Sequence, residues 1–208
     1  MRMIRLRDLL LPLLFLCALG LLPTPSCGQP TGELLLNGGF EGGSGSDGMG
    51  GGVPRWKAFE LGYEIDRQVH HSGDQCIRCD SLRPKTLHGA SVTVTLNQAH
   101  AVPILVSGWS KADQVGGVKD GDYSLYVDIE YTDGTPLWGL NAPFQVGSHD
   151  WQRKQILIIP AKPVRTLSVF ALFRNHMGTS PERFRAEQQD FDGSAPQRNG
   201  RLRPFWLY

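Results

Sequence analysis

Residues 122–131 carry the clearest alternation of apolar and polar side chains in the chain. In this segment, DYSLYVDIEY, one face carries Tyr123, Leu125, Val127, Ile129 and Tyr131, and the other carries Ser124, Tyr126, Asp128 and Glu130. Successive side chains of a β-strand point to opposite faces, so this period of two predicts a strand with one buried and one solvated face. We expect it to be a central strand of a sheet.

Other short segments alternate in the same way and are separated by turn residues. The cleanest are residues 91–96 (SVTVTL), 104–111 (ILVSGWSK), 152–159 (QRKQILII) and 164–174 (VRTLSVFALFR). No helical stripe of useful length occurs before residue 180. Roughly six to nine short strands without intervening helices predict an all-β fold, built as an antiparallel β-sandwich.

Residues 1–28 have the three-part pattern of a secretory signal peptide. Arg2, Arg5 and Arg7 precede an apolar run over residues 9–22, and small and turn-forming residues follow. This run is short for a transmembrane helix, although an uncleaved signal anchor is the alternative. We expect residues 1–28 to be removed and the mature protein to be secreted, into the extracellular space or the periplasm, without membrane attachment.

Residues 179–208 are rich in arginine, glutamine, proline and glycine and show no long alternation. We expect an irregular C-terminal tail or linker here, in which residues 183–189 form either a helical turn or a divergent last strand. The segment ends in PFWLY, whose apolar side chains have no evident place to pack, so we expect a truncated or altered C-terminus. The predicted domain therefore spans residues 29–178.

The charge balance argues against strongly anionic macromolecules as partners. The chain has 21 basic and 20 acidic residues, and removing residues 1–28 takes away three arginines and one aspartate, which leaves 18 and 19. Binding to nucleic acid or to an anionic membrane needs clustered positive charge. We therefore expect neither partner.

Two cysteines remain in the predicted domain, Cys76 and Cys79 in QCIRCDS. A redox CxxC motif opens a helix, and a zinc site needs a second pair of ligands, and neither condition is met. Residues three apart on an extended chain point to opposite faces, which disfavours a disulfide between them. We expect ordinary strand cysteines, with Cys79 the better buried.

Several motifs follow one another in a defined order between residues 33 and 178. They are NGGFE (37–41), HSGDQCIRCDS (71–81), SVTVTL, VSGWSKA (106–112), YSLYVDIEYTDG, HDWQRKQILII and LSVFALFR. This order resembles the galactose-binding-like jelly roll of secreted carbohydrate-binding modules. The resemblance implies two stacked antiparallel sheets, with ligand bound on a sheet face or in loops at one end. It also implies a domain that brings a fused or partner catalytic domain to a polysaccharide.

The resemblance further implies a structural calcium ion at the edge of the sandwich. Its ligands in this family are the glutamate of the NGGFE motif, groups of an SG turn and an aspartate in a closing strand. Glu41, Gly73 and Asp74 match the first two, whereas residues 180–184 read SPERF where the closing strand is expected. Calcium favours several oxygen ligands, so the missing aspartate weakens the expected site. A missing closing strand would also leave one sheet edge unpaired.

A sugar-binding platform needs an aromatic face for the pyranose ring and polar groups for its hydroxyls. The candidate residues are Trp109, Tyr126, Asp128, Glu130 and Arg174. They form one site only if their strands lie in one sheet and point to the same side. The alternative is that Trp109 fills the core and the acids form an ordinary solvated face.

Trp138 is a separate candidate for ligand binding. It lies in the segment TPLWG, which we expect to be a loop after the turn at residues 132–134. Folds of this type can bind ligands at loop tips, so we predict that Trp138 offers a second way to bind a sugar.

The pair Asp128 and Glu130 also permits a glycosidase interpretation, because alternate strand positions lie about 7 Å apart. However, no histidine accompanies the pair, and a shallow sheet face rarely raises a carboxyl pKa as general acid catalysis requires. No GxSxG or HExxH pattern is present either. We therefore predict a non-catalytic carbohydrate-binding domain. The alternative is a protein-interaction or scaffold β-sandwich without sugar binding.

Overall fold

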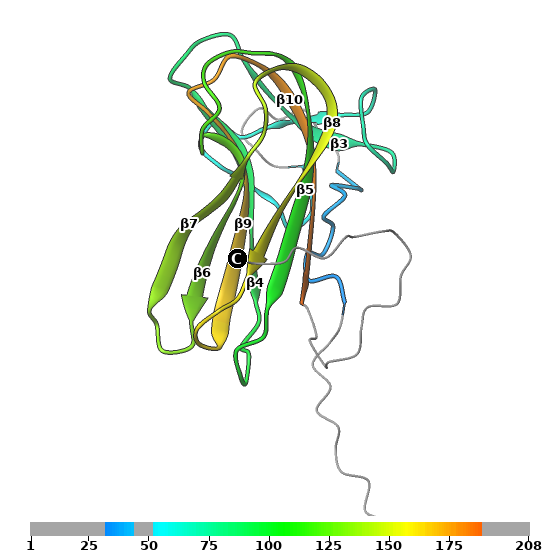
Figure 1. Ribbon diagram of the computed structural model, residues 1–208. Coiled ribbons are helices and arrows are strands. Elements are labelled where there is room, and N and C mark those ends of the chain that lie inside the picture. The colour runs from blue at the N-terminus through cyan, green and yellow to red at the C-terminus, as the bar shows by residue number, and fades with distance from the viewer. Residues whose placement is uncertain (1–31, 44–51, 189–208) are drawn as a thin grey trace, which may run out of the picture.

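The computed structural model describes residues 32–43 and 52–188, and these residues form ten strands in two five-stranded antiparallel sheets. Figure 1 shows the sheets stacked, with β7, β6 and β9 on the left and β5 to their right. Within the described residues there is no helix long and apolar enough to span a membrane. The predicted all-β sandwich is confirmed.

Two sheets make up the sandwich. Sheet I has the order β1 (Lys57–Ala58), β4 (Leu87–Thr95), β9 (Val164–Arg174), β6 (Tyr123–Tyr131) and β7 (Pro136–Pro143). Sheet II has the order β2 (Glu64–Asp66), β3 (Cys76–Ser81), β10 (Gly178–Gln188), β5 (Ile104–Val115) and β8 (Gly147–Ile158). The connections from β5 to β6 and from β7 to β8 therefore cross from one sheet to the other.

Alternate residues of the central strands fill the space between the sheets. On β6 the inward side chains are Tyr123, Leu125, Val127, Ile129 and Tyr131, and all are buried. Side chains from the other strands meet them, including Leu167, Val169, Ala171 and Phe173 from β9 and Ile104, Val106, Phe184 and Ala186 from sheet II. The predicted inner face of residues 122–131 is confirmed, and burial of this apolar surface is the main stabilising contribution.

The C-terminal segment differs from the prediction. Residues 178–188 are not an irregular tail but strand β10, which pairs with β3 on one side and β5 on the other. The expected unpaired sheet edge is therefore wrong, and the alternative of a divergent last strand is correct. The sequence of β10 lacks a clear alternation of apolar and polar residues, because two of its inward residues, Ser180 and Glu182, are polar. The signal peptide at residues 1–28 and the tail beyond Gln188 lie outside the described residues.

Pro181 sits in the middle of β10, where a proline normally interrupts a ladder. Thr179 pairs with Asp113 and Glu182 pairs with Ser110 across the β10–β5 ladder, and no pair is formed at Pro181. The missing proline N–H therefore coincides with a gap in the pairing towards β5, while pairing towards β3 continues.

Both predicted strand cysteines lie on β3 and are buried free thiols. Cys79 belongs to the main core cluster, whereas Cys76 donates to the Val69 carbonyl at 3.0 Å outside it. Burial raises the pKa of the Cys76 thiol to about 12 and that of Cys79 well above its ordinary value. Neither thiol is therefore prone to redox or metal chemistry at neutral pH.

A chain of polar side chains is buried between the sheets beside Cys79. The Ser110 hydroxyl lies 2.6 Å from the Tyr123 hydroxyl and 3.0 Å from the Ser180 hydroxyl, which donates to Glu182 Oε1 at 3.0 Å. Glu182 is fully buried, and among the described residues its Oε2 atom has no hydrogen-bond partner. Burial raises the pKa of Glu182 from its ordinary 4.5 to about 8.

This buried acid makes stability fall as the pH rises. Between pH 4.5 and about 8 the folded protein keeps Glu182 protonated while the unfolded chain ionises it, so unfolding releases a proton. Glu182→Gln mimics the protonated acid and removes this loss. Each unit of pKa difference corresponds to about 1.4 kcal/mol. From pH 5 to pH 8 the free energy of unfolding of the variant should therefore rise by at least about 2 kcal/mol relative to that of the wild type.

Urea denaturation at both pH values measures this gain. Glu60→Gln at an exposed turn is the matched control and should follow the wild-type trend. Equal differences between wild type and Glu182→Gln at pH 5 and pH 8 would show that Glu182 does not titrate as its burial requires.

Candidate functional site

The outer face of sheet I carries most of the residues predicted to bind a ligand. Tyr126, Asp128 and Glu130 point outward from β6, because the residues between them point into the core. Across the ladder to β9, Tyr126 lies opposite Phe170, Asp128 opposite Ser168 and Glu130 opposite Thr166. All six side chains are partly exposed, so this face combines aromatic, hydroxyl and carboxylate groups.

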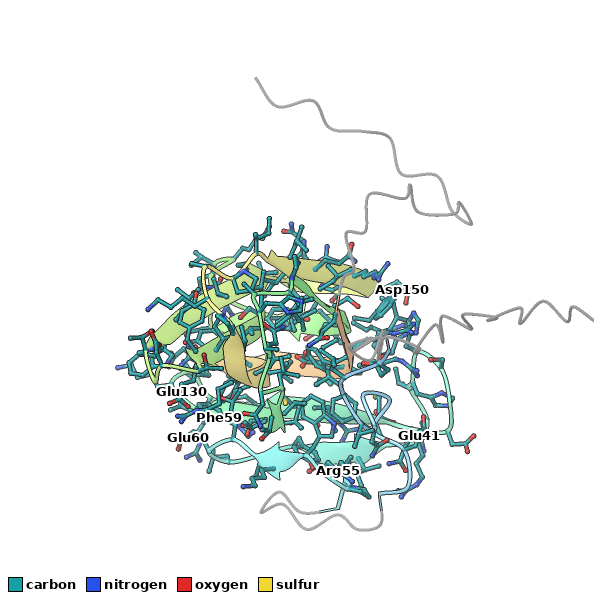
Figure 2. All side chains as sticks on the ribbon, turned by 90° about the horizontal axis from the view of Figure 1, so that it is seen from below. Glu41, Arg55, Phe59, Glu60, Glu130 and Asp150 are labelled. Atoms are coloured by element: carbon teal, nitrogen blue, oxygen red, sulfur yellow. The ribbon has the colours of Figure 1, made fainter. Side chains whose placement is uncertain are left out.

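Three aromatic rings form a row across this face. The ring of Phe170 lies 5.5 Å from that of Tyr126 and 5.7 Å from that of Phe59, with interplanar angles of 83° and 86°. Phe59 follows β1 and is held beside β4, since its N–H donates to the Gly89 carbonyl at 3.0 Å. Figure 2 shows Phe59 and Glu130 towards the same side of the molecule, with Asp150 on the opposite side.

Tyr126 of this row was a predicted site residue, whereas Phe170 and Phe59 were not, although the sequence contains a signal for Phe170. Phe170 interrupts the alternation of residues 164–174, because it is an apolar residue in an outward position. Phe59 has no such signal, since it lies in an irregular segment whose pairing with β4 is set by tertiary structure.

A β-bulge in the edge strand β7 presents Trp138 to the same face. Val127 pairs with Leu140 and Ile129 with Leu137, so Trp138 and Gly139 both lie opposite Asp128. Gly139 has a φ of 84°, and its N–H donates to Asp128 Oδ1 at 2.9 Å. Trp138 is 71% exposed as a result. It lies on a strand and not in the predicted loop.

Trp138 and the two predicted acids line one hollow of about 290 Å³ on the outer face of sheet I. Thr166 and Ser168 of β9 complete it together with residues of the 134–136 turn. The structure therefore unites the two separate predictions, because Trp138 stands beside Asp128 and Glu130. Their role in ligand binding stays a prediction.

The polar groups of the hollow are held by fixed partners. Glu130 forms an ion pair with Arg165 of the neighbouring strand. Partial burial, the charge of Asp128 and a hydrogen bond to that carboxylate raise the pKa of the Tyr126 phenol. Asp128 is thus oriented by both Tyr126 and Gly139, and such orientation presents its acceptor lone pairs in a defined direction.

Arg174 lies further along the same face. It is four residues beyond Phe170 on β9 and therefore points to the same side. Its guanidinium forms an ion pair with Asp122 at 2.5 Å, and its charge acts on the Tyr126 phenol. Arg174 can therefore border a ligand that extends along the face beyond Tyr126.

Trp109 does not join this group. It lies on β5 in sheet II, and it faces outward because the preceding Gly108 faces the core side chain of Phe184. Trp109 is half-buried, so it neither fills the core nor lies beside Tyr126. The predicted joint platform is wrong. The reason is the crossover between β5 and β6, which puts consecutive strands in different sheets.

The residues predicted to hold calcium lie together, and their polar groups contact one another. The Asp74 N–H donates to Glu41 Oε1 and Oε2 at 3.3 and 3.1 Å, and a Cβ on Gly73 would lie 1.8 Å from Glu41 Oε1. Arg183 Nη1 donates to the Ser72 carbonyl at 3.0 Å in the same turn. The residues that the structure describes include no group of three His, Cys, Asp or Glu side chains able to hold a metal.

Two solved structures show what this fold resembles. The CBM22-1 xylan-binding domain from Paenibacillus barcinonensis Xyn10C gives a TM-score of 0.53 at 16% identity, over 77% of this chain and 96% of that domain. TmCBM61 in complex with beta-1,4-galactotriose gives 0.51 at 16% identity, over 76% of this chain and 100% of that one. The fold is that of carbohydrate-binding modules. The fold implied by the order of motifs is confirmed.

Sequence comparison adds a partial likeness to WapA nucleases. A stretch of 120 residues, 54% of this chain, is 34% identical to tRNA nuclease WapA of Bacillus subtilis (strain 168). The matched stretch covers 5% of that protein, so the chain spans a small part of the curated relative. No protein-family model matches the chain.

The bulge at Gly139 should control where Trp138 lies. In Gly139→Ala the new Cβ meets no atom within 4 Å, so its cost comes from the φ of 84° alone and should be about 1–2 kcal/mol. We expect the backbone to relax and the indole N–H resonance of Trp138 to shift. Gly147→Ala is the matched control, with a φ of 91° and an equally open Cβ position.

Both variants should lose similar stability in urea denaturation, while Gly147→Ala leaves the Trp138 resonance in place. An unshifted Trp138 resonance in a folded Gly139→Ala protein would show that the bulge does not position the indole.

Calcium should not change the stability of this protein. Glu41 accepts a hydrogen bond from the Asp74 N–H, and the Ser72 carbonyl accepts one from the Arg183 guanidinium, so both oxygen groups expected to bind the ion already have partners. We expect the same melting temperature in excess EDTA and in millimolar calcium chloride. A ligand that binds only the folded state raises the melting temperature, so a calcium-dependent rise of several degrees would contradict this description.

Proposed function

We propose that this domain is a secreted, non-catalytic carbohydrate-binding module that binds a neutral polysaccharide on the outer face of sheet I. The observation that carries the proposal is the position of Trp138, which stands 71% exposed beside a hollow lined by Asp128, Glu130 and Ser168. An exposed indole next to fixed hydrogen-bonding groups suits a sugar ring with its hydroxyls.

The composition of the face indicates the kind of glycan. Arg165 and Arg174 are each paired with a carboxylate, whereas Asp128 has no ion pair among the described residues. The local balance is therefore slightly negative, which disfavours an acidic sugar by like-charge repulsion. A neutral polysaccharide has no such penalty, and its hydroxyls can donate to the carboxylates.

The row of Phe59, Phe170 and Tyr126 extends the site from Trp138 across the strands. Neighbouring strands are about 4.8 Å apart, so aromatic groups on β7, β6 and β9 and beyond β1 offer contacts over several strand widths. This length favours a chain of several sugar units over a single monosaccharide. The edge-to-face angles mean that contacts come from ring edges as well as ring faces.

The geometry does not favour catalysis by Asp128 and Glu130. Glu130 is neutralised by Arg165, and Asp128 accepts from Gly139, so neither is placed as a proton donor. The hollow also lies on an open sheet face. We infer a binding role, and the leader pattern at residues 1–28 supports secretion.

The fold neighbours support this function. Their names describe a xylan-binding domain and a galactotriose complex, which are carbohydrate ligands of those proteins. The likeness to a short part of WapA supports a module that works within or beside a larger protein. We infer that its partner is a polysaccharide and that any catalysis belongs to a fused or partner domain.

Trp138→Ala tests the site directly. The variant should bind neutral polysaccharide at least about tenfold more weakly. Truncating a central tryptophan of an interface commonly costs about 2 kcal/mol or more of binding free energy. Affinity electrophoresis through gels containing soluble xylan, galactan and other neutral polysaccharides measures the loss. Trp109→Ala is the matched control, since this tryptophan lies on the other sheet, and it should keep wild-type retardation.

A glycan array with the full chain covers sugars outside these gels. If the polysaccharide gels retard Trp138→Ala as strongly as the wild type, and its melting temperature is unchanged, the site does not lie on sheet I. No retention of the wild type on any neutral glycan would contradict sugar binding and favour the protein-interaction alternative.

A further inference from the structure

The outer face of sheet II carries a second aromatic and polar cluster around Trp109. In the register of the sheet, Trp109 lies opposite Arg183 of β10 on one side and Arg153 of β8 on the other. Residues paired across neighbouring strands point to the same face. Two guanidinium groups therefore flank one half-buried indole.

Each arginine is oriented by a neutral group. The guanidinium carbon of Arg153 lies 4.7 Å from the centre of the Trp109 ring, and its Nη2 donates to the Ser107 hydroxyl at 3.5 Å. Arg183 Nη1 donates to the Ser72 carbonyl at 3.0 Å. These contacts fix the arginines and leave further N–H groups on each fork.

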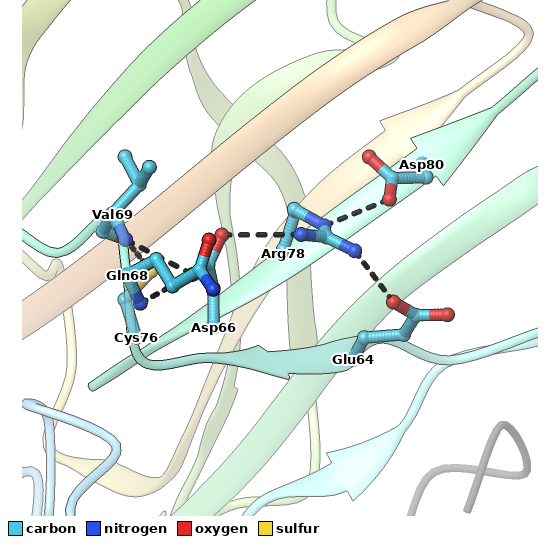
Figure 3. Close-up of polar contacts among 7 residues, drawn as sticks. All are labelled: Glu64, Asp66, Gln68, Val69, Cys76, Arg78 and Asp80. Atoms are coloured by element: carbon cyan, nitrogen blue, oxygen red, sulfur yellow. Dashed lines mark hydrogen bonds and ion pairs between the residues drawn. The ribbon is translucent and has the colours of Figure 1, made fainter. Parts of the chain in front are cut away.

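Neither Arg153 nor Arg183 forms an ion pair within the described part of the chain. Arg78 on the same sheet is a useful contrast, because it contacts Glu64, Asp66 and Asp80 at 2.8, 3.3 and 2.7 Å (Figure 3). Arg78 is thus saturated by carboxylates. Arg153 and Arg183 carry charge that no described carboxylate balances.

Two acids on this side of the molecule form ion pairs with other basic residues, and a third, Glu41, accepts a hydrogen bond from the Asp74 N–H. Glu33 pairs with Arg185 at 2.6 Å and Asp150 pairs with Lys111 at 3.2 Å. Arg153 and Arg183 without ion pairs outweigh the Glu41 carboxylate, so the local electrostatic balance around Trp109 is positive, in contrast to the acidic hollow of sheet I. This difference occurs within a chain whose net charge is only +1.

A hollow of about 370 Å³ lies beside Trp109 and Arg183, between the turns that contain Asn37 and Ser72. The His71 ring lies 4.9 Å from the Trp109 ring at the rim of this hollow. Burial and the charge of Arg183 lower the pKa of His71, so its imidazole is neutral at pH 7 and can both donate and accept. The hollow is large enough for about one sugar unit.

We infer that this face is a second saccharide-binding site, selective for sugars that carry a carboxylate or a sulfate. An arginine fork binds either group through paired charge-assisted hydrogen bonds, and the indole edge and imidazole contact the sugar body. The site is separate from the neutral-glycan face of sheet I. It does not depend on the function proposed for that face.

Isothermal titration of the full chain with three probes tests the inference. The probes are an oligogalacturonate, a sulfated galactan oligosaccharide and a neutral galactan oligosaccharide of equal length. Arg153→Gln and Arg183→Gln should each reduce the affinity for the acidic probes about tenfold, as expected for losing a hydrogen bond to a charged group. Arg83→Gln, at an exposed turn arginine without an ion pair among the described residues, is the matched control and should change nothing.

Two further arms separate this site from the one on sheet I. Trp138→Ala should keep the affinity for acidic probes, and higher salt should weaken acidic binding because both partners are charged. Equal affinity for neutral and acidic probes, or unchanged binding in folded Arg153→Gln, would overturn the inference. Tighter binding of poly-glutamate or of a single-stranded oligonucleotide than of either acidic saccharide would overturn the saccharide assignment.

Discussion

Interdigitation of alternate side chains between the two sheets is the constraint on which the rest of the molecule depends. Once Leu125, Val127 and Ile129 are buried, Tyr126, Asp128 and Glu130 must face outward, because strand side chains alternate. The same rule sends Trp109 and Lys111 out of the opposite sheet. The core therefore decides the surface chemistry, and it places the two tryptophan-centred clusters on opposite sides of the sandwich.

The periodic part of this arrangement could be predicted from the sequence. Residues 122–131 and 91–96 alternate clearly, and their strands and inner faces agree with the structure. The polar face of β6 was also predictable as a surface. The order of the motifs along the chain predicted which type of β-sandwich forms, since no single strand pattern distinguishes one β-sandwich from another.

Three features depend on information that periodicity does not contain. The assignment of Trp109 and Tyr126 to different sheets depends on a crossover, which is a property of topology. β10 depends on pairing that tolerates Ser180, Pro181 and Glu182, where tertiary structure overrides the local pattern. The exposure of Trp138 depends on a two-against-one bulge that only the register with β6 reveals.

The two outer faces differ in electrostatics more than in shape. Sheet I offers Trp138 beside carboxylates whose nearby arginines are paired, and sheet II offers Trp109 between unpaired arginines. A sandwich with two such faces could contact two chemically distinct glycans of one matrix. Such bivalence would strengthen attachment without increasing the affinity of either face.

The most direct test of the central claim is an NMR titration that follows the indole N–H resonances of the folded protein. Addition of a neutral polysaccharide fragment should shift the Trp138 resonance and leave those of Trp56 in the core and Trp109 on sheet II in place. A shift at Trp109 with none at Trp138, in the presence of measurable binding, would contradict the assignment of the site to sheet I.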